Sequence, residues 1–271
     1  MNTIIFNKEL SPGYFHMGIS APELAGKAKP GQFVMISVRD GRYDPILRRP
    51  MGIMFIEKWG IEILYQLVGR GTYIISRMGP GDPIDVIGPF GNGFQLRHDR
   101  DIWIIAGGCG LAPFFELVKQ LSHKMEKGKK ITMFLGARTY PDLPALGLLE
   151  RFGIKPGIAT EDGSAGFHGL VTELVENSLS ESHGKDGPLL LASGPFGMLR
   201  ALADLAVRRG LECFVSIDRR MACGFGVCLG CVVPVKQVSE DAQESGESGA
   251  GISYKCACTD GPVFNAREIV W

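Results

Sequence analysis

The pattern of hydrophobic and polar positions divides the chain into two differently built regions and a cysteine-rich end. From residue 1 to about residue 98, short apolar runs alternate with turns rich in Gly, Pro and Asp. Short strands at this spacing predict a small antiparallel β-barrel. The runs that read as strands are Gln32–Val38, Gly52–Glu57, Gly60–Val68 and Pro83–Ile87.

From Asp101 onward, continuous apolar runs alternate with helical patterns. Such runs are typical of parallel strands that are buried on both faces, and the alternation predicts a doubly wound parallel sheet. One helix is expected after Pro113, and another from Gly197 to Arg208 with Gly210 as its cap. The expected strands are 102–106, 131–135, 157–160, 189–192 and 214–217, the last of which would close the sheet.

Composition narrows the class of protein. The chain has 271 residues, 45% of them hydrophobic, and equal numbers of basic and acidic residues, 29 each. This balance gives no indication of nucleic acid or an anionic membrane as a partner. The sequence shows neither a signal peptide nor an apolar run of transmembrane length. Seven cysteines, five of them after residue 220, fit a reducing cytoplasm better than a disulfide scaffold.

The cysteine-rich end carries the most specific motif. Cys223, Cys228 and Cys231 form a C-x4-C-x2-C run, the plant-type spacing for a [2Fe–2S] cluster. Intervening glycines would let the backbone wrap tightly around an inorganic core. A zinc site or three buried thiols are the alternatives, but structural zinc usually has paired C-x2-C knuckles. The fourth thiolate would come from Cys256 or Cys258.

Two features of the barrel region favour a phosphate site. Leu47-Arg48-Arg49-Pro50 places adjacent arginines before a strand, and Val68-Gly69-Arg70-Gly71-Thr72 opens a short helix. Free amides at a helix start and forked guanidinium donors both suit a phosphate. Arginines on a barrel rim are also often simply solvated.

A glycine turn follows the first strand of the second region. Gly107-Gly108-Cys109-Gly110 lies between a buried strand and a helix, where α/β sheets hold nucleotides. The third glycine of the dinucleotide fingerprint is absent, and tight packing of helix on strand would equally explain the glycines. Arg138, just past the second strand, is placed to meet a ribose or an adenine-side phosphate, although an exposed arginine in a loop is more often only solvated.

The order of these parts resembles the ferredoxin-NADP reductase superfamily and, within it, the electron-transfer subunits of class B dihydroorotate dehydrogenase. The resemblance covers nearly the whole chain. It implies three domains: an FAD-binding barrel (1–98), an NAD(P)-binding α/β domain (99–214) and a [2Fe–2S] domain (215–271). Its most specific segments are Leu47–Pro50, Gly88–Phe94, Ala159–Ser164, Arg220–Gly224 and Cys258–Phe264.

The resemblance also implies cofactors, residues and a partner. Cys258 is implied as the fourth cluster ligand, because the family's cysteine directly precedes a residue-Asp-Gly-Pro stretch, and Cys256 is left over. The implied contacts of FAD are Arg49, Pro50, Met51, Gly52, Tyr65, Gln66, Gly71 and Thr72. Those of the nicotinamide nucleotide are Gly108, Gly110, Ala112, Pro113, Ser193, Gly194 and Pro195. The cluster would pass electrons to a flavin in a dihydroorotate dehydrogenase catalytic subunit, within a heterotetramer.

Two departures from the family concern hydride transfer. Gly52 stands where a serine or threonine usually faces flavin N5, and Ser193 stands where a cysteine usually lies near the nicotinamide. Cofactors carry the redox chemistry, so we predict no catalytic residue in the strict sense. The five histidines are expected at the surface or in packing, and Cys213 in the core. Cys109 is expected as a small apolar filler, with a place beside the flavin or nicotinamide as the alternative. Residues 237–251, rich in Ser, Glu and Gly, are expected to form an exposed flexible tip.

Two other functions remain open at this level. The same module could serve a ferredoxin:NADP oxidoreductase or a sulfur-metabolism reductase. It could also be a redox sensor that has lost hydride transfer, which the Gly52 and Ser193 departures would allow.

Overall fold

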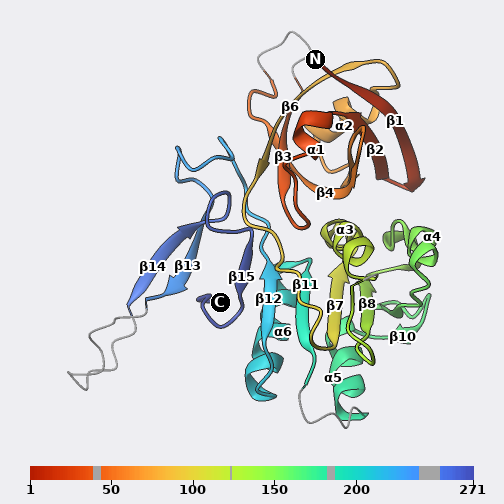
Figure 1. Ribbon diagram of the computed structural model, residues 1–271, viewed down its shortest axis with the longest axis vertical. Helices are drawn as coiled ribbons and strands as arrows, with labels where there is room; N and C mark the ends of the chain where they lie inside the picture. The colour runs from red at the N-terminus through yellow and green to blue at the C-terminus, as the bar shows by residue number, and fades with distance from the viewer. Residues whose placement is uncertain (39–43, 123, 182–186, 238–250) are drawn as a thin grey trace.

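The computed structural model describes residues 1–271 except 39–43, 123, 182–186 and 238–250. It contains a closed barrel, a seven-stranded sheet flanked by helices, and a two-stranded hairpin (Figure 1). The strands are β1 (Asn2–Ser11), β2 (Tyr14–Ser20), β3 (Phe33–Ser37), β4 (Arg49–Glu57), β5 (Gly60–Gln66), β6 (Pro83–Phe90), β7 (Ile102–Gly107), β8 (Ile131–Ala137), β9 (Gly157–Thr160), β10 (Phe167–His168), β11 (Leu189–Ser193), β12 (Cys213–Ser216), β13 (Val232–Lys236), β14 (Ile252–Cys256) and β15 (Val263–Asn265). The helices are α1 (Pro22–Ala25), α2 (Arg70–Ser76), α3 (Ala112–Leu121), α4 (Leu146–Leu149), α5 (Val171–Glu181) and α6 (Phe196–Arg208), with 3₁₀ turns η1 (Gly108–Leu111), η2 (Tyr140–Asp142) and η3 (Glu150–Phe152). The predicted combination of barrel, parallel sheet and small C-terminal segment is confirmed.

The barrel has the strand order β1-β2-β5-β4-β3-β6. Alternate residues point inward, as in any strand, and the interior is filled by aliphatic side chains that are fully buried, among them Met17, Ile53 and Ile63. The four predicted strands are present. The β1–β2 hairpin was not predicted, because register shifts between Ile4 and Phe6 and between Glu9 and Ser11 interrupt the alternation that would identify it.

The second sheet has the order β10-β9-β8-β7-β11-β12-β15, with β15 antiparallel to β12. The prediction that 214–217 closes the sheet is therefore wrong. Phe214 pairs with Asn265 and Ser216 with Val263, so a strand from the cysteine-rich end forms the edge. This segment is only 3 residues long, which is too short to show a strand pattern in the sequence.

Helices cover both faces of this sheet, as a doubly wound fold requires. Side chains of α3 and α4 pack on one face, and those of α5 and α6 on the other. The core on the α3 face continues into the barrel, since Met54, Phe55 and Leu64 pack with α3 residues such as Phe115. Some side chains of β4 and β5 therefore pack into the core of the α/β region, while the barrel interior forms a separate apolar cluster.

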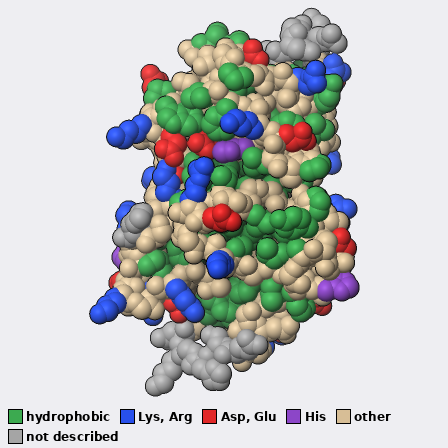
Figure 2. Space-filling view, turned by 90° about the vertical axis from the view of Figure 1, so that its right-hand side faces the viewer, with side chains coloured by type: hydrophobic (Ala, Val, Ile, Leu, Met, Phe, Trp, Pro, Cys, Tyr) green, Lys and Arg blue, Asp and Glu red, His purple; other side chains and the backbone are tan. Residues whose placement is uncertain are grey.

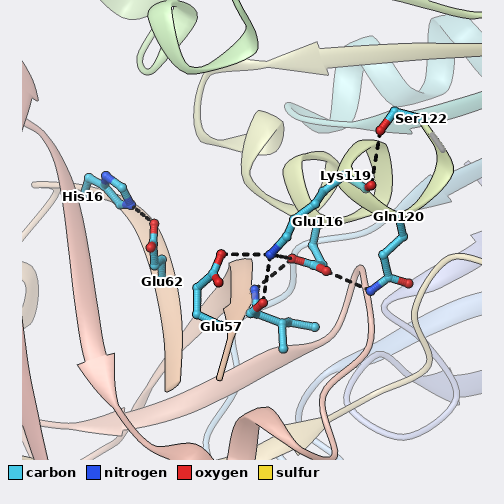
Figure 3. Close-up of polar contacts among 8 residues, drawn as sticks. His16, Glu57, Glu62, Glu116, Lys119, Gln120 and Ser122 are labelled. Atoms are coloured by element: carbon cyan, nitrogen blue, oxygen red, sulfur yellow. Dashed lines mark hydrogen bonds and ion pairs between the residues drawn. The ribbon is translucent and has the colours of Figure 1, made fainter. Parts of the chain in front are cut away.

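A polar network fastens the same junction. Glu116 of α3 is only 3% exposed, and its Oε2 accepts a hydrogen bond from the Ile56 amide of β4 at 2.9 Å. Lys119, one turn further on, donates to the Ile56 carbonyl at 3.0 Å and to Glu57 at 2.8 Å (Figure 3). Acidic and basic side chains gather along the line between the two lobes in Figure 2. The two regions are thus held by both apolar and polar contacts.

The hairpin of β13 and β14 projects from the cysteine-rich end (Figure 1). Val233 and Val235 of β13 are buried, whereas the first four residues of β14 are exposed. The predicted tip at 237–251 falls mostly on 238–250, outside the described residues, as do His123 and His183. Across the described part of the chain, none of the helices has the length and apolar character needed to cross a membrane.

Candidate cofactor sites

The start of β4 and the start of α2 form the first candidate site. The guanidinium of Arg49 lies directly against Gly71, and a Cβ atom at Gly71 would collide with it. The Thr72 hydroxyl accepts hydrogen bonds from the amides of Val68 and Gly69 at 2.9 and 3.2 Å. These bonds fix the glycine turn beneath Arg49. The predicted phosphate-binding residues are therefore brought together, with the cation above the turn.

An apolar surface borders this phosphate site. Leu47, Leu67 and Val68 are large hydrophobic residues that are 52%, 39% and 76% exposed. Exposed apolar side chains beside a cationic group are the arrangement that a planar ring with a phosphate tail would cover. A Cβ atom on Gly52 would meet nothing within 4 Å. The residues present thus fit FAD, with open space at Gly52.

Tyr65 and Gln66 point to opposite sides of β5. Tyr65 is buried in the barrel, where its hydroxyl donates to Asn7 Oδ1 at 3.0 Å, and burial raises its pKa to about 12. Gln66 is exposed, and its side-chain amide donates to the Tyr14 hydroxyl at 3.1 Å. Of the two side chains, only that of Gln66 lies at the surface of the barrel, where a ligand could contact it. Tyr65 can offer its backbone there.

The second candidate site lies where β7 and β11 end side by side. These strands are parallel neighbours, and Ser193 pairs with Ala106. A Cβ at Gly110 would collide with the Ser193 carbonyl, and one at Gly107 would lie 2.7 Å from Pro195 Cδ. The two loops therefore meet backbone to backbone. The structure brings together the residues predicted for the nicotinamide nucleotide, at the sheet edge where α/β folds bind ligands.

Several residues near this edge differ in what they can contribute. Ala112 and Pro113 are buried at the start of α3, so they can offer only backbone to a ligand. Arg138 is exposed at the end of β8 and free to reach a phosphate. Burial raises the pKa of the Cys109 thiol, and that of Cys213, to about 12. Both thiols stay protonated, which fits the predicted role as apolar filler.

The third candidate site is the loop that carries three cysteines. Gly224 and Gly226 have φ angles of +84° and +89°, a conformation that favours glycine. Amides of the loop point at sulfur: Cys228 N donates to Cys223 Sγ at 3.5 Å, and Gly230 N to Cys228 Sγ at 3.4 Å. Burial opposes ionisation of Cys223, but amide hydrogen bonds outweigh it and lower its pKa to about 6. The loop is therefore built to stabilise thiolates.

The fourth sulfur can come from either of two buried cysteines in this geometry. Cys258 accepts a hydrogen bond from Gly226 N at 3.2 Å and lies beside the Cys231 thiol. Burial, reinforced by that neighbour, raises the pKa of Cys258 to about 12. Burial and Cys231 also raise the pKa of Cys256. The amide contact to the cysteine loop favours Cys258.

No group of three or more His, Cys, Asp or Glu side chains in the described ranges is arranged around one metal ion. A [2Fe–2S] cluster does not require such a group, because each iron takes two cysteines. Paired sulfurs, such as Cys231 with Cys258, are the arrangement it needs. The donor set, thiols served by backbone amides, fits an iron–sulfur cluster.

The cysteine loop packs against the barrel beside the first site. A Cβ on Gly224 would collide with Met35 of β3, and Met35 pairs with Pro50 of β4 across the strands. The rings of Phe90 and Phe225 lie 6.1 Å apart, and Asn92 donates to the Thr259 carbonyl at 2.9 Å. The cysteine loop therefore contacts β3, the strand that pairs with β4.

Three residues of the junctions were not identified from the sequence. Tyr14, Met35 and Glu116 lie on elements whose apolar patterns account for them as ordinary strand and helix positions. Their roles depend on a neighbour in another region of the chain. The sequence contains no signal that would have singled them out.

Comparisons with known proteins agree with this arrangement. Residues 104–204 match the family described as the oxidoreductase NAD-binding domain. Residues 218–270 match the iron-sulfur cluster binding domain of dihydroorotate dehydrogenase B. The two matches coincide with the second and third candidate sites.

Curated relatives match the chain over most of its length. The electron transfer subunit of dihydroorotate dehydrogenase B (NAD(+)) from Caldanaerobacter subterraneus subsp. tengcongensis is 35% identical over 90% of this chain and 88% of its own. The subunit of the same name from Desulforamulus reducens is 34% identical over 97% of this chain and 94% of its own. That from Geobacillus kaustophilus is 34% identical over 99% and 97%.

Solved structures show the same fold. The structure of an NADH-dependent reduced ferredoxin-NADP oxidoreductase, reported for flavin-based electron bifurcation, has a TM-score of 0.82 and 29% identity, covering 100% of this chain and 90% of that chain. A ferredoxin NADP+ reductase from Neisseria gonorrhoeae with bound FAD and NADP has a TM-score of 0.63 and 17% identity, over 77% and 90%. The second likeness shows the fold alone.

These findings confirm the predicted enzyme class, an oxidoreductase subunit for electron transfer, and the predicted cofactors, FAD, NAD(H) and a [2Fe–2S] cluster. Identity above 30% over nearly the full length, together with both domain matches, leads to one assignment. The chain belongs to the family of electron transfer subunits of dihydroorotate dehydrogenase B (NAD(+)).

Proposed function

We propose that this chain carries electrons between NAD(H) and a [2Fe–2S] cluster by way of FAD, and exchanges them with the flavin of a dihydroorotate dehydrogenase catalytic subunit. The observation that carries the proposal is the position of the cysteine loop. Gly224 touches Met35, whose strand partner Pro50 lies on the proposed flavin strand. The proposed flavin and cluster sites are thus neighbours.

The cofactors divide the chemistry among themselves: the nicotinamide supplies or takes a hydride, FAD handles electrons in pairs or singly, and the cluster handles single electrons. The protein holds and orients them. Arg49 binds the FAD phosphates, and the loop amides of Gly226, Cys228 and Gly230 donate to the sulfurs and so tune the cluster potential.

The proposal extends to particular residues and domains. FAD binds within 1–98, the nicotinamide nucleotide within 99–214 and the cluster within 215–271. The cluster ligands are Cys223, Cys228, Cys231 and Cys258. FAD is contacted by Arg49, Pro50, Met51, Gly52, Tyr65, Gln66, Gly71 and Thr72, and the nicotinamide nucleotide by Gly108, Gly110, Ala112, Pro113, Ser193, Gly194 and Pro195. The complex is a heterotetramer in the cytoplasm, a reducing compartment that suits cysteines held in no disulfide.

Substituting the two candidate cysteines tests the ligand set. Cys258→Ser should abolish the iron and acid-labile sulfide found by chemical analysis of anaerobically purified protein, while FAD stays bound. Cys256→Ser is the matched control, since it removes a buried thiol two residues away and should leave both cofactors in place. Cluster loss in the Cys256 variant alone would contradict the ligand assignment.

Reconstitution tests the partner. The chain combined with a dihydroorotate dehydrogenase catalytic subunit should reduce NAD when dihydroorotate is added, and the isolated subunits should not. A complex that forms but shows no dihydroorotate-dependent NAD reduction would refute this partner.

A second candidate function rests on the structural likeness at 29% identity and TM-score 0.82 to the NADH-dependent reduced ferredoxin-NADP oxidoreductase. There the same module would serve a different flavoprotein. Co-purification from the native source distinguishes the two, because the bound partner is either a dihydroorotate dehydrogenase or another reductase. A redox sensor without hydride transfer would instead show no bleaching of the flavin band when NADH is added anaerobically.

A further inference from the structure

The side chain of Tyr14 joins the barrel to the nicotinamide domain. It extends from β2 and is 5% exposed. Its hydroxyl accepts a hydrogen bond from Gln66 Nε2 at 3.1 Å and donates to Asp142 Oδ1 at 3.3 Å. The other oxygen of Asp142 accepts from Thr139 Oγ1 at 3.0 Å. Four side chains thus form a continuous chain of hydrogen bonds across the junction.

The hydroxyl lies between the two proposed redox sites. Gln66, on one side, is the proposed flavin contact whose side chain faces outward. On the other side is Gly108 of the nicotinamide turn, where a Cβ atom would lie 4.0 Å from the Tyr14 oxygen. Tyr14 and Gln66 are direct partners in the β2–β5 register, so the barrel itself sets their spacing. The hydroxyl therefore lies between the proposed flavin contact Gln66 and the glycine turn proposed for the nicotinamide nucleotide.

The contacts between the barrel and the α/β domain limit the movement of the two ends of this chain of hydrogen bonds. Glu116 and Lys119 of α3 bind the end of β4, as Figure 3 shows, and the apolar core continues across the same junction. Two regions joined in this way do not hinge freely. The position of Asp142 relative to Tyr14 is then fixed by the fold.

We propose that Tyr14 is a positioning residue for hydride transfer, whose hydroxyl holds the Gln66 amide and the Thr139–Asp142 turn at the separation that the flavin and the nicotinamide require. The inference rests on the proposed function. In the step concerned, a hydride leaves reduced nicotinamide and is accepted by FAD, so NADH is oxidised and FAD is reduced. Tyr14 neither gains nor loses a proton.

The ionisable groups around the hydroxyl keep it protonated. Burial, then the charge of Asp142, raises the Tyr14 pKa to about 12, and Arg138 opposes this rise. The hydrogen bond to Asp142 is therefore available throughout the pH range of an ordinary assay, and the effect of removing it should not vary between pH 6 and 9.

The test is Tyr14→Phe, which removes only the oxygen atom. At saturating NADH under anaerobic conditions, stopped-flow bleaching of the flavin should slow about tenfold, because small displacements of reacting groups cost rate steeply. FAD and iron content should be unchanged. The dissociation constant for NAD+, measured by calorimetry, should change by a smaller factor than the rate of flavin bleaching. Tyr254→Phe is the control, since that side chain is 66% exposed on β14.

A second variant separates positioning from general damage. Asp142→Ala breaks the same contact from the other side. If the contact is real, the double variant should bleach no more slowly than the slower single variant, and its unfolding midpoint should fall no further than that of the less stable single variant. The inference would be overturned if the two substitutions slowed bleaching by factors that multiply and lowered the unfolding midpoint by amounts that add. The inference would also be overturned if NADH bleached the flavin of the wild type and that of the Tyr14→Phe variant at the same rate. A wild type that NADH does not bleach would refute the proposed function, and the inference would fall with it.

Discussion

Replacing Glu116 with alanine should loosen the junction between the barrel and the nicotinamide domain by a predictable amount. The carboxylate makes three contacts: with the Ile56 amide at 2.9 Å, with Gln120 Nε2 at 2.8 Å and with Lys119 Nζ at 3.4 Å. Gln120 and Lys119 are partly exposed and can turn to water, and Lys119 keeps its bond to Glu57 at 2.8 Å. The main loss is therefore the Ile56 bond.

In the Glu116→Ala variant the Ile56 amide has no strand to replace the lost carboxylate as acceptor. β3 pairs with β4 only over Arg49–Gly52, so the end of β4 has no strand on that side and depends on Glu116. The Ile56 amide is partly buried, and a polar group left without a partner on burial costs about 1–3 kcal/mol. With the lost side-chain packing, we expect a decrease of about 2–3 kcal/mol in the free energy of unfolding, or roughly 5–10 °C in the melting midpoint.

Urea unfolding followed by circular dichroism and by flavin fluorescence measures this loss. Glu116→Gln keeps one carbonyl oxygen for the Ile56 amide and should lose about half as much stability. Lys255→Ala removes an ion pair with Glu268 in which both side chains are about half exposed, and should cost well under 1 kcal/mol. If Glu116→Ala unfolded within about 0.5 kcal/mol of the wild type, the assignment of Glu116 as a junction residue would be wrong.

Three further outcomes are expected. Gly52→Ser should fold normally, since a Cβ there meets nothing within 4 Å, and should speed flavin reduction by NADH severalfold by adding a hydroxyl donor; a slower reaction would show that the family's hydroxyl role does not apply here. Arg49→Ala should weaken FAD retention by about 1.5–3 kcal/mol through the lost charge-assisted contact, measured as flavin occupancy after dialysis. The pKa of the Cys213 thiol is about 12 in the folded protein, against its ordinary 9.0 in the unfolded chain. The protonated thiol therefore contributes fully to stability below pH 9, and this contribution is lost as the pH rises toward 12. Between pH 9 and 12 the unfolding free energy of the Cys213→Ala variant should therefore fall less steeply with pH than that of the wild type, by about 1.4 kcal/mol per pH unit. Equal slopes in the two proteins would refute the raised pKa of Cys213.

Local features of the chain were sufficient for much of the fold. Short apolar runs between turns rich in Gly, Pro and Asp identified β3 to β6 of the barrel, and longer alternation of continuous apolar runs with helical patterns identified β7, β8, β9 and β11, because runs and turns reflect burial and backbone geometry within a few residues. The spacing of Cys223, Cys228 and Cys231 indicated the cluster for a similar reason, since ligand geometry constrains neighbouring residues of one loop.

Features that depend on distant residues were decided by the tertiary structure. β15 is too short to carry a pattern, and β12 is an inner strand only because β15 pairs with it. Tyr65 and Gln66 are adjacent in sequence, yet one points into the barrel core and the other into the junction. Alternation along β5 sets these opposite directions, but the partner that the outward side chain meets comes from another element and is not encoded in the residues of β5.

The sequence by itself therefore determined the three kinds of region, the cysteine motif and the glycine turns, since each arises from contacts within a few residues along the chain. The folded structure alone decided that Met35 of β3 contacts the cysteine loop, that Glu116 binds the end of β4, and that Tyr14 reaches Asp142. Such contacts join residues 60 to 190 positions apart in sequence, and they form only when packing brings whole domains together.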